Sequence, residues 1–100
     1  MSLENITETI QKKLAMAPSI NAKVKFDFDS EGVLFIDATQ NPPVLSHEDL
    51  DSDVTFQCST DVFVKIMNGQ QDPTMAYMMG KLKIKGSMGL AMKLNAILED

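Results

Sequence analysis

The sequence contains no arginine and no tryptophan, and it has one cysteine and one histidine among its 100 residues. Proteins that bind nucleic acids usually hold phosphates and base edges with arginine, so this absence and the net charge of −5 argue against that class. A single cysteine excludes an internal disulfide bond and fits a reducing compartment. The apolar runs are only a few residues long, whereas a membrane-spanning helix needs about 20.

Neither end of the sequence shows a targeting signal. The first residues lack a basic region followed by an apolar run, and Leu98-Glu99-Asp100 is not a peroxisomal address. We therefore expect the protein to reside in the cytoplasm. A chain of this length forms one domain with one core, and we expect that domain to comprise residues 1–100.

The first half of the sequence predicts one helix followed by strands. Apolar residues spaced by three and four predict a helix over residues 3–14, and Pro18 prevents its continuation. Alternating apolar and polar residues then predict a hairpin of residues 22–28 and 33–38. A short third strand is expected at residues 44–45.

The second half predicts strands separated by helices. A strand over residues 53–58 leads into a helix that ends at Asn68-Gly69, and Asp72-Pro73 starts another short helix. A last strand over residues 81–85 and a last helix follow. A hairpin at the start with helix-linked strands later indicates an α+β fold, with a five-stranded mixed sheet and helices packed mainly on one face.

The C-terminal part changes from a strand period to a helix period at one glycine. Leu82 and Ile84 alternate with lysines before Gly86, as in a half-solvated strand. After Gly86 one helical face is apolar, and Met88 and Met92 add a second apolar strip. One helix needs less apolar surface than this to pack on a sheet. The excess predicts an apolar cavity between the sheet and the last helix.

Methionine is concentrated near this cavity. Six of the seven methionines after Met1 lie within 26 residues: Met67, Met75, Met78, Met79, Met88 and Met92. Methionine is flexible and polarizable, which suits a surface that adapts to varied apolar ligands. It is also a common core residue, so composition leaves both interpretations open.

The lysines are as unevenly placed as the methionines. Residues 73–98 contain no acidic residue and four lysines: Lys81, Lys83, Lys85 and Lys93. The three that alternate along the last strand can protect an edge strand from pairing with other chains. They can also contact an anionic membrane surface. The sequence leaves both roles open.

No catalytic or metal-binding motif is evident. We interpret His47 as a surface histidine and Cys58, which has the inward parity of its strand, as a core residue. Residues 49–53 imitate the start of a calcium loop but lack its glycine and final glutamate, so we interpret them as a solvated loop. An esterase or thioesterase would need a base near Ser59, Ser87 or Cys58, and His47 is the one histidine available.

The segment Gly86-Ser87-Met88-Gly89 is rich in glycine at the expected start of a helix. An anion can bind at such a helix start. The glycines equally fit close packing between a strand and the following helix, because the segment lacks the full phosphate-loop pattern.

The sequence resembles the sterol carrier protein type 2 domain family. The resemblance lies in Asn68-Gly69, Asp72-Pro73, Ala76-Tyr77 and the whole run from Gly80 to Leu94. It implies a five-stranded mixed sheet with an apolar lipid tunnel between sheet and helices. Members of the family carry fatty acids, acyl-CoAs, phospholipids or sterols, and most lack catalytic activity, so we expect neither an enzyme nor a cofactor.

The resemblance also implies which residues meet the ligand. The tunnel would be lined from the short helix, the last strand and the last helix by Met75, Met78, Met79, Leu82, Ile84, Met88, Leu90, Met92 and Leu94. The expected function is that of a non-enzymatic intracellular lipid carrier. The alternative is an accessory domain that presents a lipid-like intermediate to a partner enzyme of lipid metabolism.

Overall fold

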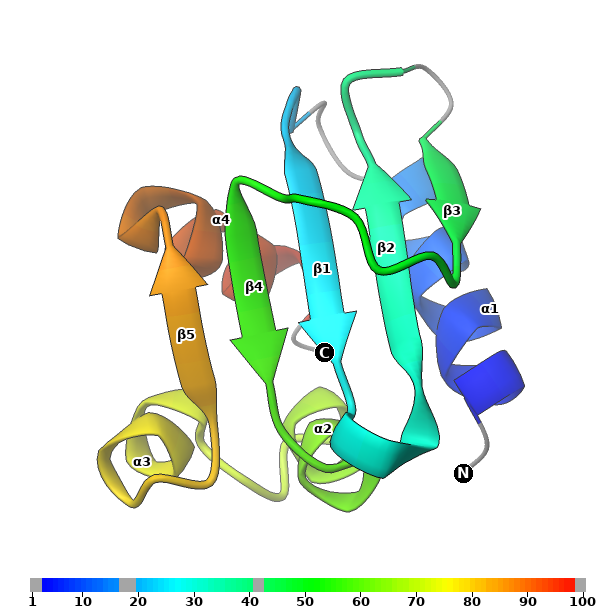
Figure 1. The fold of residues 1–100 in the computed structure, drawn as a ribbon. Helices are drawn as coiled ribbons and strands as arrows, with labels where there is room; N and C mark the ends of the chain where they lie inside the picture. The colour runs from blue at the N-terminus through cyan, green and yellow to red at the C-terminus, as the bar shows by residue number, and fades with distance from the viewer. Residues whose placement is uncertain (1–2, 17–19, 41–42, 99–100) are drawn as a thin grey trace.

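A computed structural model describes residues 3–16, 20–40 and 43–98 of the chain. Its elements follow the order expected from the sequence (Figure 1). In chain order they are α1 (Leu3–Ala15), β1 (Lys23–Asp27), the 3₁₀ helix η1 (Asp29–Glu31), β2 (Val33–Asp37), β3 (Val44–Ser46), β4 (Val54–Gln57), α2 (Thr60–Met67), α3 (Pro73–Met78), β5 (Lys83–Gly86) and α4 (Met88–Leu98).

The strands form one mixed sheet with the order β3-β2-β1-β4-β5. The central pair, β1 and β4, is parallel, and the other neighbours are antiparallel. In Figure 1, α1 and α4 lie behind the sheet, and α2 and α3 lie at its lower end. The predicted α+β fold, with a five-stranded mixed sheet and helices mainly on one face, is confirmed.

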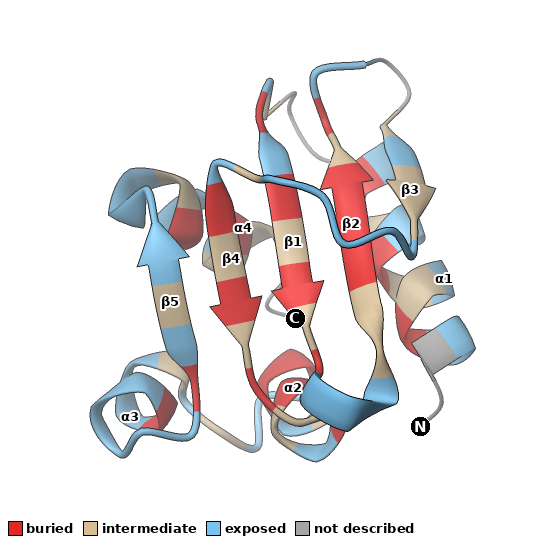
Figure 2. Cartoon of the chain, viewed as in Figure 1, coloured by how far each residue is buried: buried red, intermediate tan, exposed pale blue. Residues whose placement is uncertain are grey.

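The core lies between the sheet and the helices. Strand residues of one parity, such as Phe26 and Phe56, are buried beneath the helices, and Figure 2 shows the buried positions concentrated in β1, β2 and β4. Three phenylalanine rings pack closely: the ring centroid of Phe26 lies 5.2 Å from that of Phe56 and 5.2 Å from that of Phe63. The helices contribute Ile6, Ile10, Leu14, Ile66, Met67, Ala91 and Leu94 to this core.

The opposite face of the sheet carries mostly polar side chains, such as those of Lys25 and Thr55, and is crossed by the segment between β3 and β4 (Figure 1). The Lys25 Nζ lies 2.8 Å from an Asp49 carboxylate oxygen, and the Lys23 backbone N–H donates to the Asp53 carboxylate at 2.8 Å. Phe35, which pairs with Lys25 in the register, is buried on this face. The acidic segment therefore ties the connection to the sheet.

Gly86 allows β5 to approach the start of β4. Its φ is 99°, and a Cβ at this position would lie 2.3 Å from the Asp53 carbonyl oxygen. The next residue, Ser87, donates its N–H to that same carbonyl at 3.0 Å and accepts the Leu90 N–H on Oγ at 3.3 Å. Close packing followed by a serine cap accounts for this glycine-rich start of α4.

Candidate apolar binding pocket

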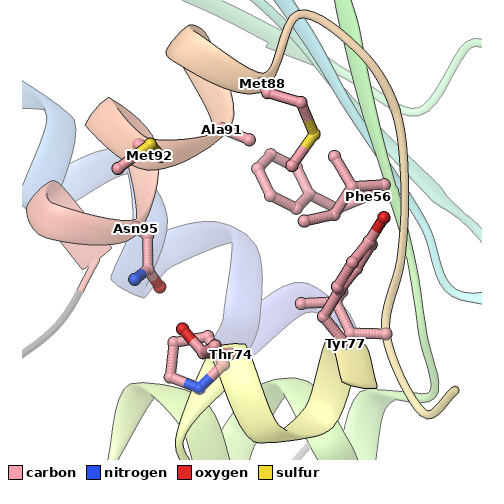
Figure 3. Close-up of a pocket in the computed structure, with 10 residues that line it drawn as sticks. Phe56, Thr74, Tyr77, Met88, Ala91, Met92 and Asn95 are labelled. Atoms are coloured by element: carbon pink, nitrogen blue, oxygen red, sulfur yellow. The ribbon is translucent and has the colours of Figure 1, made fainter. Parts of the chain in front are cut away.

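A partly open pocket of about 240 Å³ lies between the edge of the sheet and the helices α3 and α4 (Figure 3). Most of its wall is apolar, with three polar side chains among the lining residues. Those residues are Phe56, Pro73, Thr74, Tyr77, Leu82, Ile84, Met88, Ala91, Met92 and Asn95. In the residues that the structure describes, the space is an open pocket, and the tunnel implied by the family resemblance is not seen.

The position of α3 is set at both of its ends. The Asp72 carboxylate accepts the Thr74 backbone N–H at 2.9 Å, and proline occupies the first turn. After the helix, the backbone N–H groups of Lys81 and Leu82 both donate to the Ala76 carbonyl, at 2.9 and 3.1 Å. Ala76 is fully buried, so Pro73, Thr74 and Tyr77 are the residues that α3 presents to the pocket.

The strand wall of the pocket comes from the edge of the sheet. Ile84 of β5 pairs with Phe56 of β4, so both side chains point toward the helices. On the other side, Met88, Met92 and Asn95 follow a spacing of four and three along α4 and therefore share one helical face. Met88 and Met92 are the second apolar strip that the sequence indicated.

Four of the residues predicted to meet the ligand line the pocket: Leu82, Ile84, Met88 and Met92. Two others belong to the packed interior. Leu94 is only 1% exposed, and Leu90 packs against the core from the partly buried edge of α4. The pocket wall also includes Ala91, whose short side chain leaves room beside Met88 and Met92.

The three methionines predicted from the short helix lie elsewhere. Met75, Met78 and Met79 are exposed and are not among the residues that line the pocket, because buried Ala76 sets the rotation of α3. Besides Ala91, the pocket residues that sequence reasoning missed are Phe56, Pro73, Thr74, Tyr77 and Asn95. The spacing of Asn95 from Met88 and Met92 was the available signal, since residues three and four apart on a helix share a face.

The pocket has a small inner extension of about 30 Å³ that reaches toward the aromatic core. It shares Phe56, Pro73, Leu82 and Asn95 with the outer pocket. Its remaining wall is formed by Phe26, Phe63 and Ile66. Asn95 is thus the polar side chain at the junction of the two spaces.

The other candidate residues have structural roles. Burial, with a smaller effect of nearby Asp29, raises the pKa of Cys58 to about 12, so its thiol remains protonated near neutral pH. Ser59 caps α2 by accepting the Val62 N–H at 3.2 Å. His47 is exposed, with Nδ1 3.0 Å from the Val33 carbonyl oxygen. It follows β3, at the opposite edge of the sheet from Ser87.

The lysines of β5 do not surround the pocket mouth. Lys83 and Lys85 pair with Gln57 and Thr55, so their side chains point to the outer face of the sheet, away from Ile84. Lys81 and Lys93 are exposed. No helix among the described residues is both long enough and apolar enough to cross a bilayer.

Residues 3–99 match the model of the SCP-2 sterol transfer family. Hydroxysteroid dehydrogenase-like protein 2 from Bos taurus is 55% identical over 49 residues, covering 49% of this chain and 12% of that protein. The Mus musculus protein of the same name is 41% identical over 81 residues, covering 77% of this chain and 16% of that protein. The chain therefore spans only a small part of these relatives.

Solved structures show the same fold. The solution structure of Sterol Carrier Protein-2 from Aedes aegypti, in complex with the C16 fatty acid palmitate, superimposes with a TM-score of 0.80 and 20% identity. The match covers 98% of this chain and 96% of that one. Together with the match over residues 3–99, this agreement identifies the chain as a member of the SCP-2 sterol transfer family.

Proposed function

We propose that the chain binds one lipid in the pocket between α3, β5 and α4 and acts as a non-enzymatic carrier. The observation that supports this proposal is the open apolar pocket of about 240 Å³. The palmitate complex of the Aedes aegypti protein, which shares the fold, supports it further. The protonated thiol of Cys58 and the separation of His47 from Ser87 argue against covalent catalysis.

The size of the pocket limits how much of a ligand it encloses. A methylene group occupies roughly the 30 Å³ of a liquid water molecule, so the pocket accommodates about eight such groups. Burying them contributes about 6 kcal/mol gross, from which immobilisation removes several kcal/mol. A longer chain extends beyond the pocket, and exposed parts of Met88 and Met92 border its mouth.

The test uses one substitution at two methionines. Met88 lines the pocket, whereas Met78 is 74% exposed and lies outside it. In Met88→Asp an unpaired carboxylate faces the ligand, so we expect binding of a fluorescent fatty acid to be abolished. The matched control Met78→Asp should bind as the wild type does. Equal loss in both variants, or in neither, would contradict the proposal.

A second candidate function is that of an accessory domain. It is favoured by the relatives named hydroxysteroid dehydrogenase-like protein 2, of which the chain covers only 12–16%. In this case the pocket presents a lipid-like intermediate to an enzyme of lipid metabolism. A stable complex with such an enzyme, measured by analytical ultracentrifugation, supports this role. Lipid found in the freshly purified chain by native mass spectrometry supports the carrier.

Two further parts of the proposal concern the surroundings of the protein. Residence in the cytoplasm stays a prediction. We also propose transient contact with anionic membranes through Lys81, Lys83, Lys85 and Lys93, which are exposed in a segment without acidic residues. Because Lys83 and Lys85 point to the outer face of the sheet, such contact places the pocket mouth beside the membrane rather than against it.

A further inference from the structure

We propose that the pocket selects ligands with an uncharged polar group, such as a hydroxyl, ester or amide, and that Asn95 is the residue that recognises this group. The inference rests on the proposed function, because it names the ligand class of the same pocket. Three observations support it: the unpartnered amide of Asn95, its place in the pocket, and the absence of charge from the lining.

The first observation is the state of the Asn95 side chain. It is partly buried and lines both the outer pocket and the inner extension beside Phe56. A side-chain amide offers two donors and one acceptor, yet in the described structure the Asn95 amide makes no hydrogen bond to the protein.

The second observation is geometric. Figure 3 shows the Asn95 amide directed toward α3, from which Thr74 and Tyr77 also line the pocket. A hydrocarbon chain that fills this space removes water from the amide without replacing its hydrogen bonds, which is unfavourable for a polar group. A ligand that places a hydroxyl, ester or amide between Asn95 and Thr74 avoids this loss.

The third observation concerns charge. None of the residues lining the pocket, in the part of the chain that the structure describes, is charged. The lysines of β5 point to the other face of the sheet, and the whole chain has a net charge of −5. A carboxylate beside Asn95 would therefore lack a cationic partner in an apolar space, whereas an uncharged polar group needs none.

Helix propensity gives an independent reason to assign a function to Asn95. It lies within α4, between the core residue Leu94 and the end of the helix. Asparagine is less favourable than leucine at such a position, because its side chain competes for backbone hydrogen bonds. If Asn95 serves the ligand, Asn95→Leu should raise the melting temperature of the ligand-free protein. A structural role would give the opposite shift.

The experiment compares 1-octanol with octanoate, two eight-carbon probes, by isothermal titration calorimetry near pH 7.5. We expect the wild type to bind 1-octanol at least about tenfold more tightly, a difference that one well-made hydrogen bond supplies. Asn95→Leu should bind 1-octanol about tenfold more weakly than the wild type does, because the hydroxyl loses its partner. Asn95→Lys should reverse the preference in favour of octanoate, because the new ammonium group pairs with the carboxylate. Asn68→Leu and Asn68→Lys, at the exposed end of α2, are the matched controls and should keep the wild-type preference.

The outcomes separate this inference from the proposed function. Equal affinity for both probes in the wild type, or an unchanged affinity of Asn95→Leu for 1-octanol, overturns the role of Asn95. If Met88→Asp still abolishes binding in that case, the pocket remains the lipid site. If the wild type binds neither probe nor a fluorescent fatty acid, the proposed function fails as well.

Discussion

Replacing Leu94 and Met88 separately by alanine tests which face of α4 is core and which is pocket wall. Leu94 is 1% exposed and packs in the core, whereas Met88 is 49% exposed and lines the pocket. Removing three carbon groups from Leu94 corresponds to about 2.4 kcal/mol of transfer free energy, and the cavity left behind raises the loss toward about 3–5 kcal/mol. Met88→Ala removes a side chain that is only half buried, so we expect a loss below about 1.5 kcal/mol.

The assay is urea unfolding of both ligand-free variants, followed by ligand titration. In urea the free energies of unfolding of the two variants should differ by at least about 1.5 kcal/mol, which in a domain of this size corresponds to at least about 6 °C in melting temperature. Met88→Ala should also shift ligand preference toward bulkier molecules, because the pocket becomes larger. If Met88→Ala is as destabilised as Leu94→Ala and keeps its ligand preference, Met88 is a core residue and the pocket assignment is wrong.

Three other predictions concern stability and transfer. The pKa of Cys58 is about 12 in the folded protein, against a reference value of 9.0. Between these values the folded protein keeps the thiol proton while the unfolded chain releases it, so the free energy of unfolding should fall above pH 9 by up to about 1.4 kcal/mol per pH unit. Unfolding curves between pH 8 and 11 should show this loss in the wild type and less of it in Cys58→Ala. Gly86→Ala should lower the free energy of unfolding in urea by more than about 2 kcal/mol, because the new Cβ meets the Asp53 carbonyl oxygen. Gly69→Ala is the control: its φ is 75° and no atom lies near the new Cβ, so the loss should be only about 1 kcal/mol. The triple variant Lys81→Gln, Lys83→Gln and Lys85→Gln should transfer lipid more slowly from anionic vesicles at low salt, with its ligand affinity nearly unchanged. An unchanged transfer rate would mean that these lysines only protect the edge strand.

The sheet was predictable because apolar and polar residues alternate along its central strands, and this alternation indicates which face is buried. Residues 22–28 and 53–58 alternate strictly, so the inward parity of Phe26, Phe56 and Cys58 follows from the sequence. β2 is apolar at consecutive positions, and its period alone does not say which side chain faces the helices. Only the register with β1 places Phe35 on the outer face, and register is a property of the assembled sheet.

The pocket was less predictable because α3 is too short to have a clear period. A helix of six residues completes fewer than two turns, so its methionines and its polar residues are equally plausible wall positions from the sequence. The choice is made by the buried Ala76 and by the two backbone hydrogen bonds to its carbonyl from Lys81 and Leu82. These tertiary contacts direct Met75 and Met78 to solvent.

A small residue and flexible ones together explain why a space remains at this edge of the sheet. Ala91 is the buried residue of α4 that lines the pocket, and its short side chain does not fill the volume in front of Ile84. Met88 and Met92 border that volume with unbranched side chains that change rotamer at little cost. A wall built in this way adapts to the apolar part of different ligands. Discrimination among those ligands then depends on the polar residues that face the pocket, and Asn95 is the one at its inner junction.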